Sequence, residues 1–403
     1  MPALLWRTQE VAQWLTVTLC WIATFYTVIA AFAMPFFSKR AGIRHVGWTS
    51  VSVLKPLCCV EPRLYENLAT FCEQAHPRFQ LLFGVSSPAD AAIGVVRRLQ
   101  AAYPQCDIEL VVDSRVHGSN LKVSNLINMA QRARHDIIVL ADSDIAVEPD
   151  YLDTVTAPLA DFDTGVVTCL YRAQSVGGFW PRVGALFINE WFAPSVRVAH
   201  AGGSRRFGFG ATLALRRTTL ESIGGFETLK DCLADDYWLA EHTRALGLNT
   251  VLSPVIVATD VIEPTFTTLW LREVRWLRTI RSVNPPGFAS LIITFTSPWL
   301  LVGALLACEL ASRDAAHFFM VLALSISTVV GTIARILLHA RSARYSRTFC
   351  RDLPLVPLRD TLLALQWLGA VFGSHVVWRG ARVSVASRVR RRRTSIMEIS
   401  DGQ

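Results

Sequence analysis

An uncharged segment near the N-terminus constrains this chain more than any other feature of its sequence. No charged residue occurs between Glu10 and Lys39, and the residues between them are mostly apolar or aromatic. As a helix, such a segment is long enough to cross a hydrocarbon core of about 30 Å. A cleaved signal peptide is the alternative interpretation, but the apolar run is longer than is usual in such peptides and no clear small-residue cleavage site follows it. The sequence therefore predicts a transmembrane anchor over residues 1–38.

The charges that flank this segment predict its orientation. Lys39, Arg40 and Arg44 follow the anchor, and they outnumber Arg7, the one basic residue before it. Because basic residues gather on the cytoplasmic side of membrane helices, we expect the domain after the anchor to lie in the cytosol. The chain has no N-x-Ser/Thr sequon, which agrees with that side of the membrane.

The last third of the chain, residues 285–403, is again apolar and predicts further membrane contact. Residues 285–308 and 315–334 are two uncharged runs separated by a short polar turn, and they predict a helical hairpin. A third apolar run, 361–378, contains Ser374 and His375. It predicts either a third span or, as we prefer, a re-entrant or interfacial helix. The basic tail from Arg388 to Arg393 then favours anionic lipid headgroups over nucleic acid.

Composition supports a membrane protein and argues against other classes. Hydrophobic residues make up 52% of the 403 residues and charged residues 18%, which is too apolar for an ordinary soluble enzyme. The nine cysteines include no C-x-x-C motif, so neither a disulfide framework nor a zinc knuckle is expected. Four of the 40 basic residues are lysine, and this bias with the compact length favours a protein of the bacterial cytoplasmic membrane.

The middle of the chain, residues 39–284, predicts one α/β domain. Short β-rich runs alternate there with helical stretches, as in an open sheet with helices on its faces. The expected strands are 51–54, 80–85, 108–112, 137–140 and 166–170, and the expected helices are 62–73, 89–102, 120–134 and 149–159. Ligands of such sheets bind beyond the carboxyl ends of the strands. The polar residues directly after each strand are therefore the candidates for a site.

Acidic residues occupy these positions. Asp90 follows the second expected strand, and Asp142 and Asp144 follow the fourth with one residue between them. Two carboxylates at a strand end suit a hard divalent ion, Mg²⁺ or Mn²⁺, that also binds a diphosphate. The alternative interpretation is a solvated turn in which Asp144 caps the next helix.

Two further segments stand out. Asp236 lies at the start of a helix, where an acid can serve as a cap or complement the helix dipole. In the helix after Pro264, Arg272, Arg275 and Trp276 share one face. This helix is either a basic amphipathic helix on the membrane or a source of guanidinium groups for a phosphate and of an indole for a substrate.

Together these motifs resemble the D, D, D, (Q/R)-x-x-R-W pattern of inverting family-2-like glycosyltransferases. The chain is most similar to ceramide glucosyltransferases, of the family-2/21-like group. That family combines an N-terminal anchor, a cytosolic nucleotide-sugar domain of the GT-A (Rossmann-like) fold and C-terminal membrane helices. Three further segments resemble it, namely 51–57, 60–62 with 67–68, and 118–126.

Two departures and two rival families keep other interpretations open. The chain has Ala193 before Pro194 where eukaryotic members have histidine, and Asp144 where they usually have glycine.

Bacterial hopanoid-biosynthesis glycosyltransferases look much the same, including a Trp-Arg-Gly sequence, here 378–380. A processive polysaccharide synthase would need more membrane helices than this chain offers. A non-catalytic scaffold is a further alternative, against which the complete set of acids argues.

The resemblance implies a role for each matched residue. Asp90 would hold the uracil or ribose of a UDP-sugar, and Asp142 with Asp144 would place Mg²⁺ or Mn²⁺ on its diphosphate. Asp236 would be the general base that activates the hydroxyl of a membrane lipid, most simply ceramide receiving glucose with inversion. Lys122 would assist at the nucleotide, or is a solvated lysine. Three residues would close over the diphosphate and acceptor, namely Arg272, Arg275 and Trp276, and the loop 201–212 would line the sugar pocket or form a plain hairpin loop.

Overall fold

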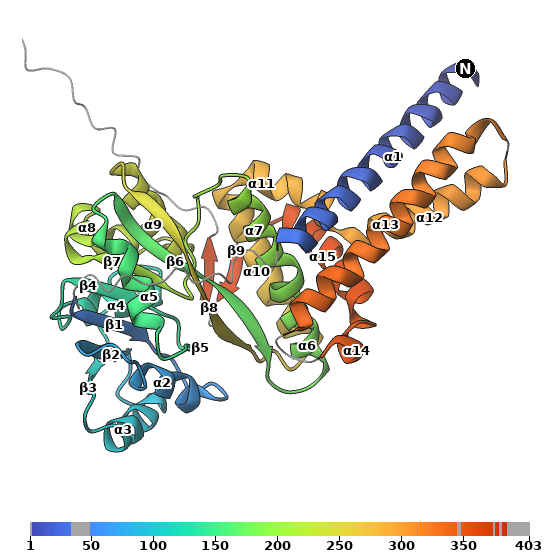
Figure 1. The fold of residues 1–403 in the computed structure, drawn as a ribbon. Helices are drawn as coiled ribbons and strands as arrows, with labels where there is room; N and C mark the ends of the chain where they lie inside the picture. Colours follow the sequence, from blue (N-terminus) through green and yellow to red (C-terminus); the bar gives the residue numbers. More distant parts are fainter. Residues whose placement is uncertain are drawn as a thin grey trace, which may run out of the picture.

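The computed structural model joins a mixed α/β domain to a projecting arm of long helices (Figure 1). The structure describes residues 2–33, 49–313, 315–344, 348–373, 375–378 and 381–384. Several basic residues that the sequence analysis used lie outside the described residues, and so does the 379–380 part of the Trp-Arg-Gly sequence. These basic residues are Lys39, Arg40, Arg44 and the arginines from Arg388 to Arg393.

An eight-stranded sheet forms the centre of the α/β domain, in the order β3-β2-β1-β4-β7-β6-β8-β5. The first four strands in this order are parallel, and β7 runs antiparallel between β4 and β6. Each of the five expected strands lies within an observed one. The strands are β1 (Val51–Pro56), β2 (Phe79–Val85), β3 (Asp107–Val112), β4 (Ile137–Leu140), β5 (Ile145–Ala146), β6 (Thr164–Ser175), β7 (Leu213–Arg216) and β8 (Asn249–Val261).

Helices bury both faces of this sheet. In β1, Val53 contributes to the apolar cluster that includes residues of α2, α3 and α5, whereas Leu54 contributes to the cluster that includes residues of α4 and α9. Because successive residues of a strand point to opposite faces, a strand covered on both sides needs this continuous apolar sequence. The helices are α2 (Leu64–Cys72), α3 (Ala92–Ala102), α4 (Leu121–Ala130), α5 (Tyr151–Thr156), α8 (Arg217–Ser222) and α9 (Asp235–Ala245).

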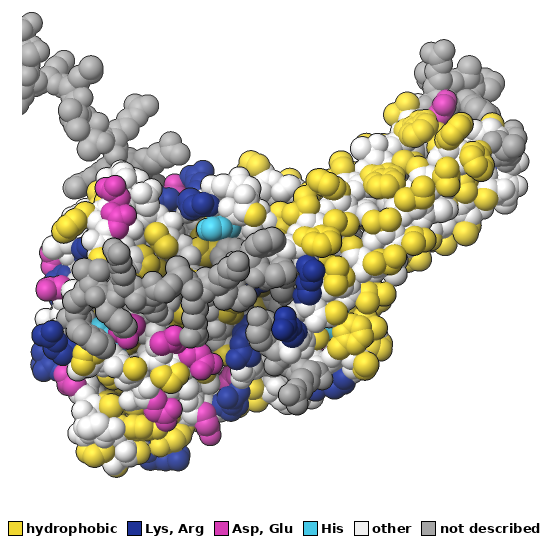
Figure 2. Space-filling view, in the orientation of Figure 1, with side chains coloured by type: hydrophobic (Ala, Val, Ile, Leu, Met, Phe, Trp, Pro, Cys, Tyr) yellow, Lys and Arg dark blue, Asp and Glu magenta, His cyan; other side chains and the backbone are white. Residues whose placement is uncertain are grey.

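The arm consists of α1 (Pro2–Ala33), α12 (Thr296–Ala311) and α13 (Phe318–Ala343), which pack against one another. Apolar side chains cover its visible surface, while charged ones gather on the α/β domain (Figure 2). Inside the arm, Thr24 hydrogen-bonds Ser327 at 2.9 Å and Thr27 hydrogen-bonds Thr296 at 2.7 Å. Small polar pairs of this kind join helices in lipid, where burial of apolar surface gives no driving force. By length and hydropathy, two described helices can span a membrane, α1 from Thr8 and α13.

The expected first helix of the hairpin, residues 285–308, is broken in the structure. It forms α11 (Pro285–Ser290), a 3₁₀ turn and α12, with a bend of 52° between the two halves. Pro298 lies in the first turn of α12, and its ring would clash with the carbonyl of residue 294 if the helix continued from before. Together the two halves are long and apolar enough to cross a membrane, so the bent pair is a third candidate span if it acts as one unit.

Two other helices have bounds that differ from those of the apolar runs. The second hairpin helix continues nine residues beyond Ala334, as part of α13. The apolar run 361–378 is not one helix, because α15 (Leu355–Val371) ends within it and His375–Trp378 forms strand β9, paired with β10 (Ala381–Ser384). The helix α15 packs against α10 (Phe266–Val283), α12 and α6 (Phe179–Phe187).

A buried ion network explains why α13 continues past Ala334. Arg335 is 5% exposed and pairs with Glu190 at 2.8 Å and with Asp360 of α15 at 2.9 Å. One turn later, His339 contacts the other oxygen of Glu190. Since each charge has its partners, the arginine can remain on a buried helix face, which sequence alone assigns to a solvent-exposed boundary. The network fixes α13 and α15 against the π-helical turn Ile188–Phe192.

Replacing Arg335 with alanine should destabilise the protein by about 3–5 kcal/mol, because it leaves Glu190 and Asp360 buried without their partner. The measurement is thermal unfolding of the full chain in one detergent. The matched control is Arg313→Ala, which removes an ion pair with Glu309 whose side chains are 46% and 52% exposed. An exposed pair contributes less than about 1 kcal/mol, so equal losses in the two variants would contradict a structural role for the buried network.

Candidate active site

Acidic residues from distant parts of the chain meet one lysine at the carboxyl edge of the parallel strands. Asp142 follows β4, and its Oδ1 lies 2.7 Å from Nζ of Lys122 on α4. The same Nζ lies 3.4 Å from Oδ2 of Asp235, which begins α9 together with Asp236. Lys122, which the sequence left between a nucleotide contact and a solvated lysine, is therefore held among acids, with its side chain 17% exposed.

Gly210 lies against both Asp142 and Asp236, the acids that follow β4 and begin α9. Its N–H donates a hydrogen bond of 2.9 Å to Oδ2 of Asp236. A Cβ at this position would lie 2.7 Å from Oδ2 of Asp142 and 3.3 Å from Nζ of Lys122. Only glycine lets the backbone come this near to both carboxylates. The loop 201–212 thus lies on the acidic cluster, and its contact with a sugar stays a prediction.

The Asp142-Ser143-Asp144 segment is held at each residue by a different neighbour. Nζ of Lys55 donates to the carbonyl oxygen of Asp142 at 2.9 Å. The Ser143 hydroxyl donates to Glu61 at 3.0 Å, and the Thr259 hydroxyl donates to Oδ2 of Asp144 at 2.8 Å. The alternative that Asp144 caps a helix is wrong, because strand β5 follows it directly.

Burial and mutual repulsion change the acidity of these groups. Burial, with the charges of Asp142 and Glu61, raises the pKa of Asp144 to about 7. Burial, with the charge of Asp235, raises the pKa of Asp236 to about 6. For Lys122, burial alone would lower the pKa, but the surrounding acids outweigh it and raise the pKa. The cluster thus carries more negative charge than its lysines offset.

This donor set fits a hard divalent cation. Asp142 and Asp144 offer carboxylate oxygens from one turn, and Mg²⁺ or Mn²⁺ is held in proteins by one or two such groups plus phosphate oxygens and waters. A cation here would also relieve the repulsion that raises the pKa of Asp144. The residues are therefore suitable for the expected ion.

The helix α10 brings the expected arginines to the same region. The Arg272 guanidinium lies over the Trp276 ring, 5.4 Å from its centroid, and pairs with Glu263. Its Nε and Nη2 atoms are buried and have no hydrogen-bond partner among the described residues. Nη2 lies 3.7 Å from Oε1 of Glu273 as an ion pair, and a guanidinium with free hydrogen-bond capacity suits a diphosphate group. Arg275 lies one turn after Arg272, partly exposed.

Tyr171 connects this helix with the acids, and sequence reasoning missed it. Its ring stacks on Phe192 with centroids 4.9 Å apart and meets Trp276 edge-on at 6.5 Å. Burial, with the charge of Asp236, raises the pKa of Tyr171 well above its ordinary value. A signal was present, since Tyr171 directly follows the expected strand 166–170. Glu61 and Thr259 carried no comparable signal, because turns and register bring them to the site.

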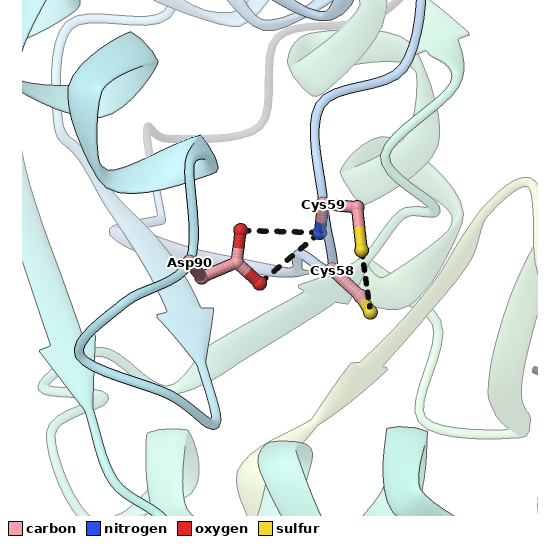
Figure 3. A group of neighbouring side chains, drawn as sticks. All are labelled: Cys58, Cys59 and Asp90. Carbon is pink, nitrogen blue, oxygen red and sulfur yellow. Dashed lines mark hydrogen bonds between the residues drawn. The ribbon is translucent and has the colours of Figure 1, made fainter.

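Asp90 lies on the same edge, in a separate group of contacts. Both its oxygens accept the backbone N–H of Cys59 at 3.1 Å (Figure 3). Oδ1 also accepts the N–H of Ala92 at 2.9 Å. It follows β2, and Asp142 follows β4, with β1 between them. Two strand spacings amount to about 10 Å, a span suited to the length of a nucleotide rather than to one ion.

Comparison with known proteins identifies the group to which this arrangement is related. A model of the family described as Glycosyl transferase family 21 matches residues 15–390. Ceramide glucosyltransferase 1 of Caenorhabditis elegans is 27% identical over 229 residues, which are 57% of this chain and 49% of the relative. Ceramide glucosyltransferase 3 of the same organism is 28% identical over 50% of this chain and 44% of its own length. The chain thus spans about half the length of these curated relatives.

A solved structure confirms the fold class. The mannosyltransferase PcManGT from Pyrobaculum calidifontis, solved in complex with GDP-Man and Mn²⁺, superposes with a TM-score of 0.52. The match covers 88% of this chain and 98% of that structure at 18% sequence identity. The predicted GT-A nucleotide-sugar fold and the resemblance to ceramide glucosyltransferases are therefore confirmed, while the hopanoid alternative stays a prediction.

Replacing Gly208 with alanine should destabilise the site by about 1–3 kcal/mol, because a Cβ there would lie 2.5 Å from the backbone oxygen of Asp236, which cannot rotate away. The matched control is Gly94→Ala on α3, where a Cβ meets nothing within 4 Å and should stabilise the helix by about 0.5–1 kcal/mol. Unfolding free energies of both variants check this. Equal values would contradict the close packing of the loop on α9.

Proposed function

The chain belongs to glycosyl transferase family 21, and we propose that it transfers a hexose from a UDP-sugar to the hydroxyl of a membrane lipid with inversion. Glucose and ceramide are the first candidates for sugar and acceptor. The single observation that carries this proposal is the convergence of Asp142 and Asp236 at Gly210 and Lys122, with Asp144 two residues after Asp142. Such a site can hold a nucleotide diphosphate at one end and activate a hydroxyl at the other.

Asp236 is the proposed general base. The Gly210 N–H fixes one of its oxygens, and the raised pKa of about 6 makes this carboxylate a stronger base than an exposed aspartate. It would take the proton of the lipid hydroxyl while that oxygen attacks the anomeric carbon. Attack on the face opposite the leaving group converts an α-linked donor into a β-glycoside.

The remaining site residues are proposed to bind the donor. Asp90 would contact the uracil or ribose, and Asp142 and Asp144 would hold Mg²⁺ or Mn²⁺. When bound, such an ion supplies charge stabilisation for the departing diphosphate. The Arg272 guanidinium, with Arg275 and Lys122, would bind phosphate oxygens, and Trp276 would border the acceptor.

The position of α10 supports a lipid acceptor. It follows β8 in the chain, packs against α15, and leads into the bent helix pair that begins with α11. Arg272 and Trp276 therefore lie between the acids and the apolar helices. A lipid would present its hydroxyl at the membrane surface while its chains remain in the bilayer. We propose an integral, multi-pass protein with a cytosolic catalytic domain, in a bacterial cytoplasmic membrane.

The proposal is tested by supplying the purified full-length chain with a UDP-sugar, Mn²⁺ and either ceramide or a hopanoid polyol, and identifying the lipid product by mass spectrometry. We expect a β-hexosyl ceramide that does not form in EDTA. Asp236→Asn should lower the turnover rate by about 100- to 10,000-fold, the usual contribution of a general base. Asp163→Asn, an exposed acid away from the site, is the matched control.

Other outcomes discriminate between the alternatives. A product with N-acetylglucosamine on the hopanoid would replace the acceptor and sugar while keeping the reaction class. Long polymers would favour a processive synthase. Turnover by Asp236→Asn within a few-fold of the parent would remove this residue as the base, and absence of UDP release with every lipid would contradict catalysis.

The pKa of Asp236 predicts the pH dependence of transfer. A base with a pKa of about 6 is deprotonated above that pH and protonated below it. The turnover rate at saturating donor and acceptor should therefore fall about tenfold per pH unit below pH 6, whereas an aspartate of ordinary pKa would hold its rate to about pH 4. Initial rates between about pH 5 and 8 check this, and a constant rate from pH 5 to 7 would contradict the assignment.

A further inference from the structure

We propose that Cys58, Cys59 and Asp90 form a binding site for a thiophilic divalent cation of the zinc class. The two cysteines directly follow β1, and Asp90 follows the neighbouring parallel strand β2. Figure 3 shows the three side chains together at the carboxyl edge of these strands. Their ligand atoms all lie within 4.8 Å of one another. A search for C-x-x-C spacing does not find this group, because its third member lies 31 residues further along the chain.

The distance between the sulfur atoms favours one shared ion. The two Sγ atoms are 3.6 Å apart. Two thiolates bound tetrahedrally to one Zn²⁺, each at about 2.3 Å, are separated by about 3.8 Å. The pair therefore needs almost no movement to bind an ion. A disulfide would require the sulfurs to approach to about 2.05 Å and to close a ring through the intervening peptide.

The backbone of Cys59 explains why two successive side chains can share a ligand. Along an extended chain, neighbouring side chains point to opposite faces. Cys59 has a φ of 64°, in the left-handed region, and this bend turns its thiol towards that of Cys58. Non-glycine residues rarely adopt this conformation. The Cys59 side chain is exposed, so water can reach the fourth coordination position of a tetrahedral ion.

Asp90 can supply the third ligand without giving up its present contacts. Its oxygens accept hydrogen bonds from the N–H groups of Cys59 and Ala92. A carboxylate has about four lone-pair positions, so an ion can be added. Binding releases the two thiol protons to solvent, and affinity therefore falls as the pH is lowered.

The chemistry of the donors separates this site from the pair Asp142 and Asp144. Thiolates select Zn²⁺ and Cd²⁺, whereas carboxylates with phosphate oxygens suit Mg²⁺ and Mn²⁺. The consequence rests on the proposed function, in which Asp90 holds the nucleotide. An ion on Asp90 competes with the uracil or ribose, so Zn²⁺ should raise the KM for the UDP-sugar and leave the turnover rate at saturating donor unchanged.

The ion site is tested first by titrating the full-length chain, reduced and freed of metal in detergent, with Cd²⁺. The parent carries Cys308→Ser and Cys350→Ser, which remove two other exposed thiols. We expect one equivalent to bind with the ultraviolet absorption of two cadmium–thiolate bonds. In Cys59→Gly, affinity should fall by more than 100-fold, beyond the 10- to 100-fold loss typical of outer-shell changes. Glycine accepts a φ of 64°, so the Cys59→Gly variant should keep its thermal unfolding midpoint. Cys58→Ser removes the other thiolate and should weaken Cd²⁺ binding in the same way.

Competition with the donor is tested separately. For each variant, the KM for the UDP-sugar is measured with and without Zn²⁺, and the ratio of the two values is compared. This ratio should exceed tenfold in the parent and approach one in Cys58→Ser. Unchanged Cd²⁺ affinity in both cysteine variants, or no binding by the parent, would overturn the site. Binding with an unchanged KM would overturn the competition. If no UDP-sugar is transferred at all, the proposed function fails, while the Cd²⁺ titration still decides the ion site.

Discussion

The α/β domain depends on holding like charges together at one edge of its sheet. Two lysines, Lys55 and Lys122, share this edge with five carboxyl groups. These groups are Glu61, Asp142, Asp144, Asp235 and Asp236. Full ionisation would leave three negative charges without a cationic partner in the cluster. Burial first, and repulsion between like charges second, disfavour the ionised forms and raise the pKa values of Asp144 and Asp236. The fold opposes this repulsion with fixed contacts, since neighbouring elements hold Asp142 and Asp144 and the Gly210 N–H holds Asp236.

The same domain is joined to the apolar C-terminal helices through buried polar contacts. On α10, Glu273 is fully buried and accepts hydrogen bonds from Arg359 at 2.7 Å and from Gln366 at 2.8 Å, both on α15. Its neighbour Arg272 instead lies over Trp276, close to the acids. One helix therefore carries, at adjacent positions, a side chain for the site and a side chain for its attachment. Because a buried pair is costly to separate, the distance between the site and the apolar helices is fixed rather than adjustable.

Prediction from the sequence succeeded where the pattern is local. The strand 137–140 and the acids that follow it were predicted correctly, since an apolar run that ends in polar residues shows where a buried strand stops. It failed where the cause lies elsewhere in the chain. Arg335 was expected beyond the end of a membrane helix, because the partners that allow it inside, Glu190 and Asp360, are distant in sequence. Thr259 reaches Asp144 only through the pairing of β5 with β8, which no local pattern reveals.

The ion site proposed at Asp90 would bring a second ion chemistry to the sheet edge that carries Asp142 and Asp144. Asp142 and Asp144 present oxygen donors with lysines nearby, whereas the Asp90 group adds two sulfur atoms. Magnesium and manganese gain little from sulfur, and zinc gains much from it, so each ion prefers its own position. Asp90 is the one carboxylate that the nucleotide and the soft ion would share. Competition for this side chain is therefore sufficient to couple the two sites, and no change in the fold is required.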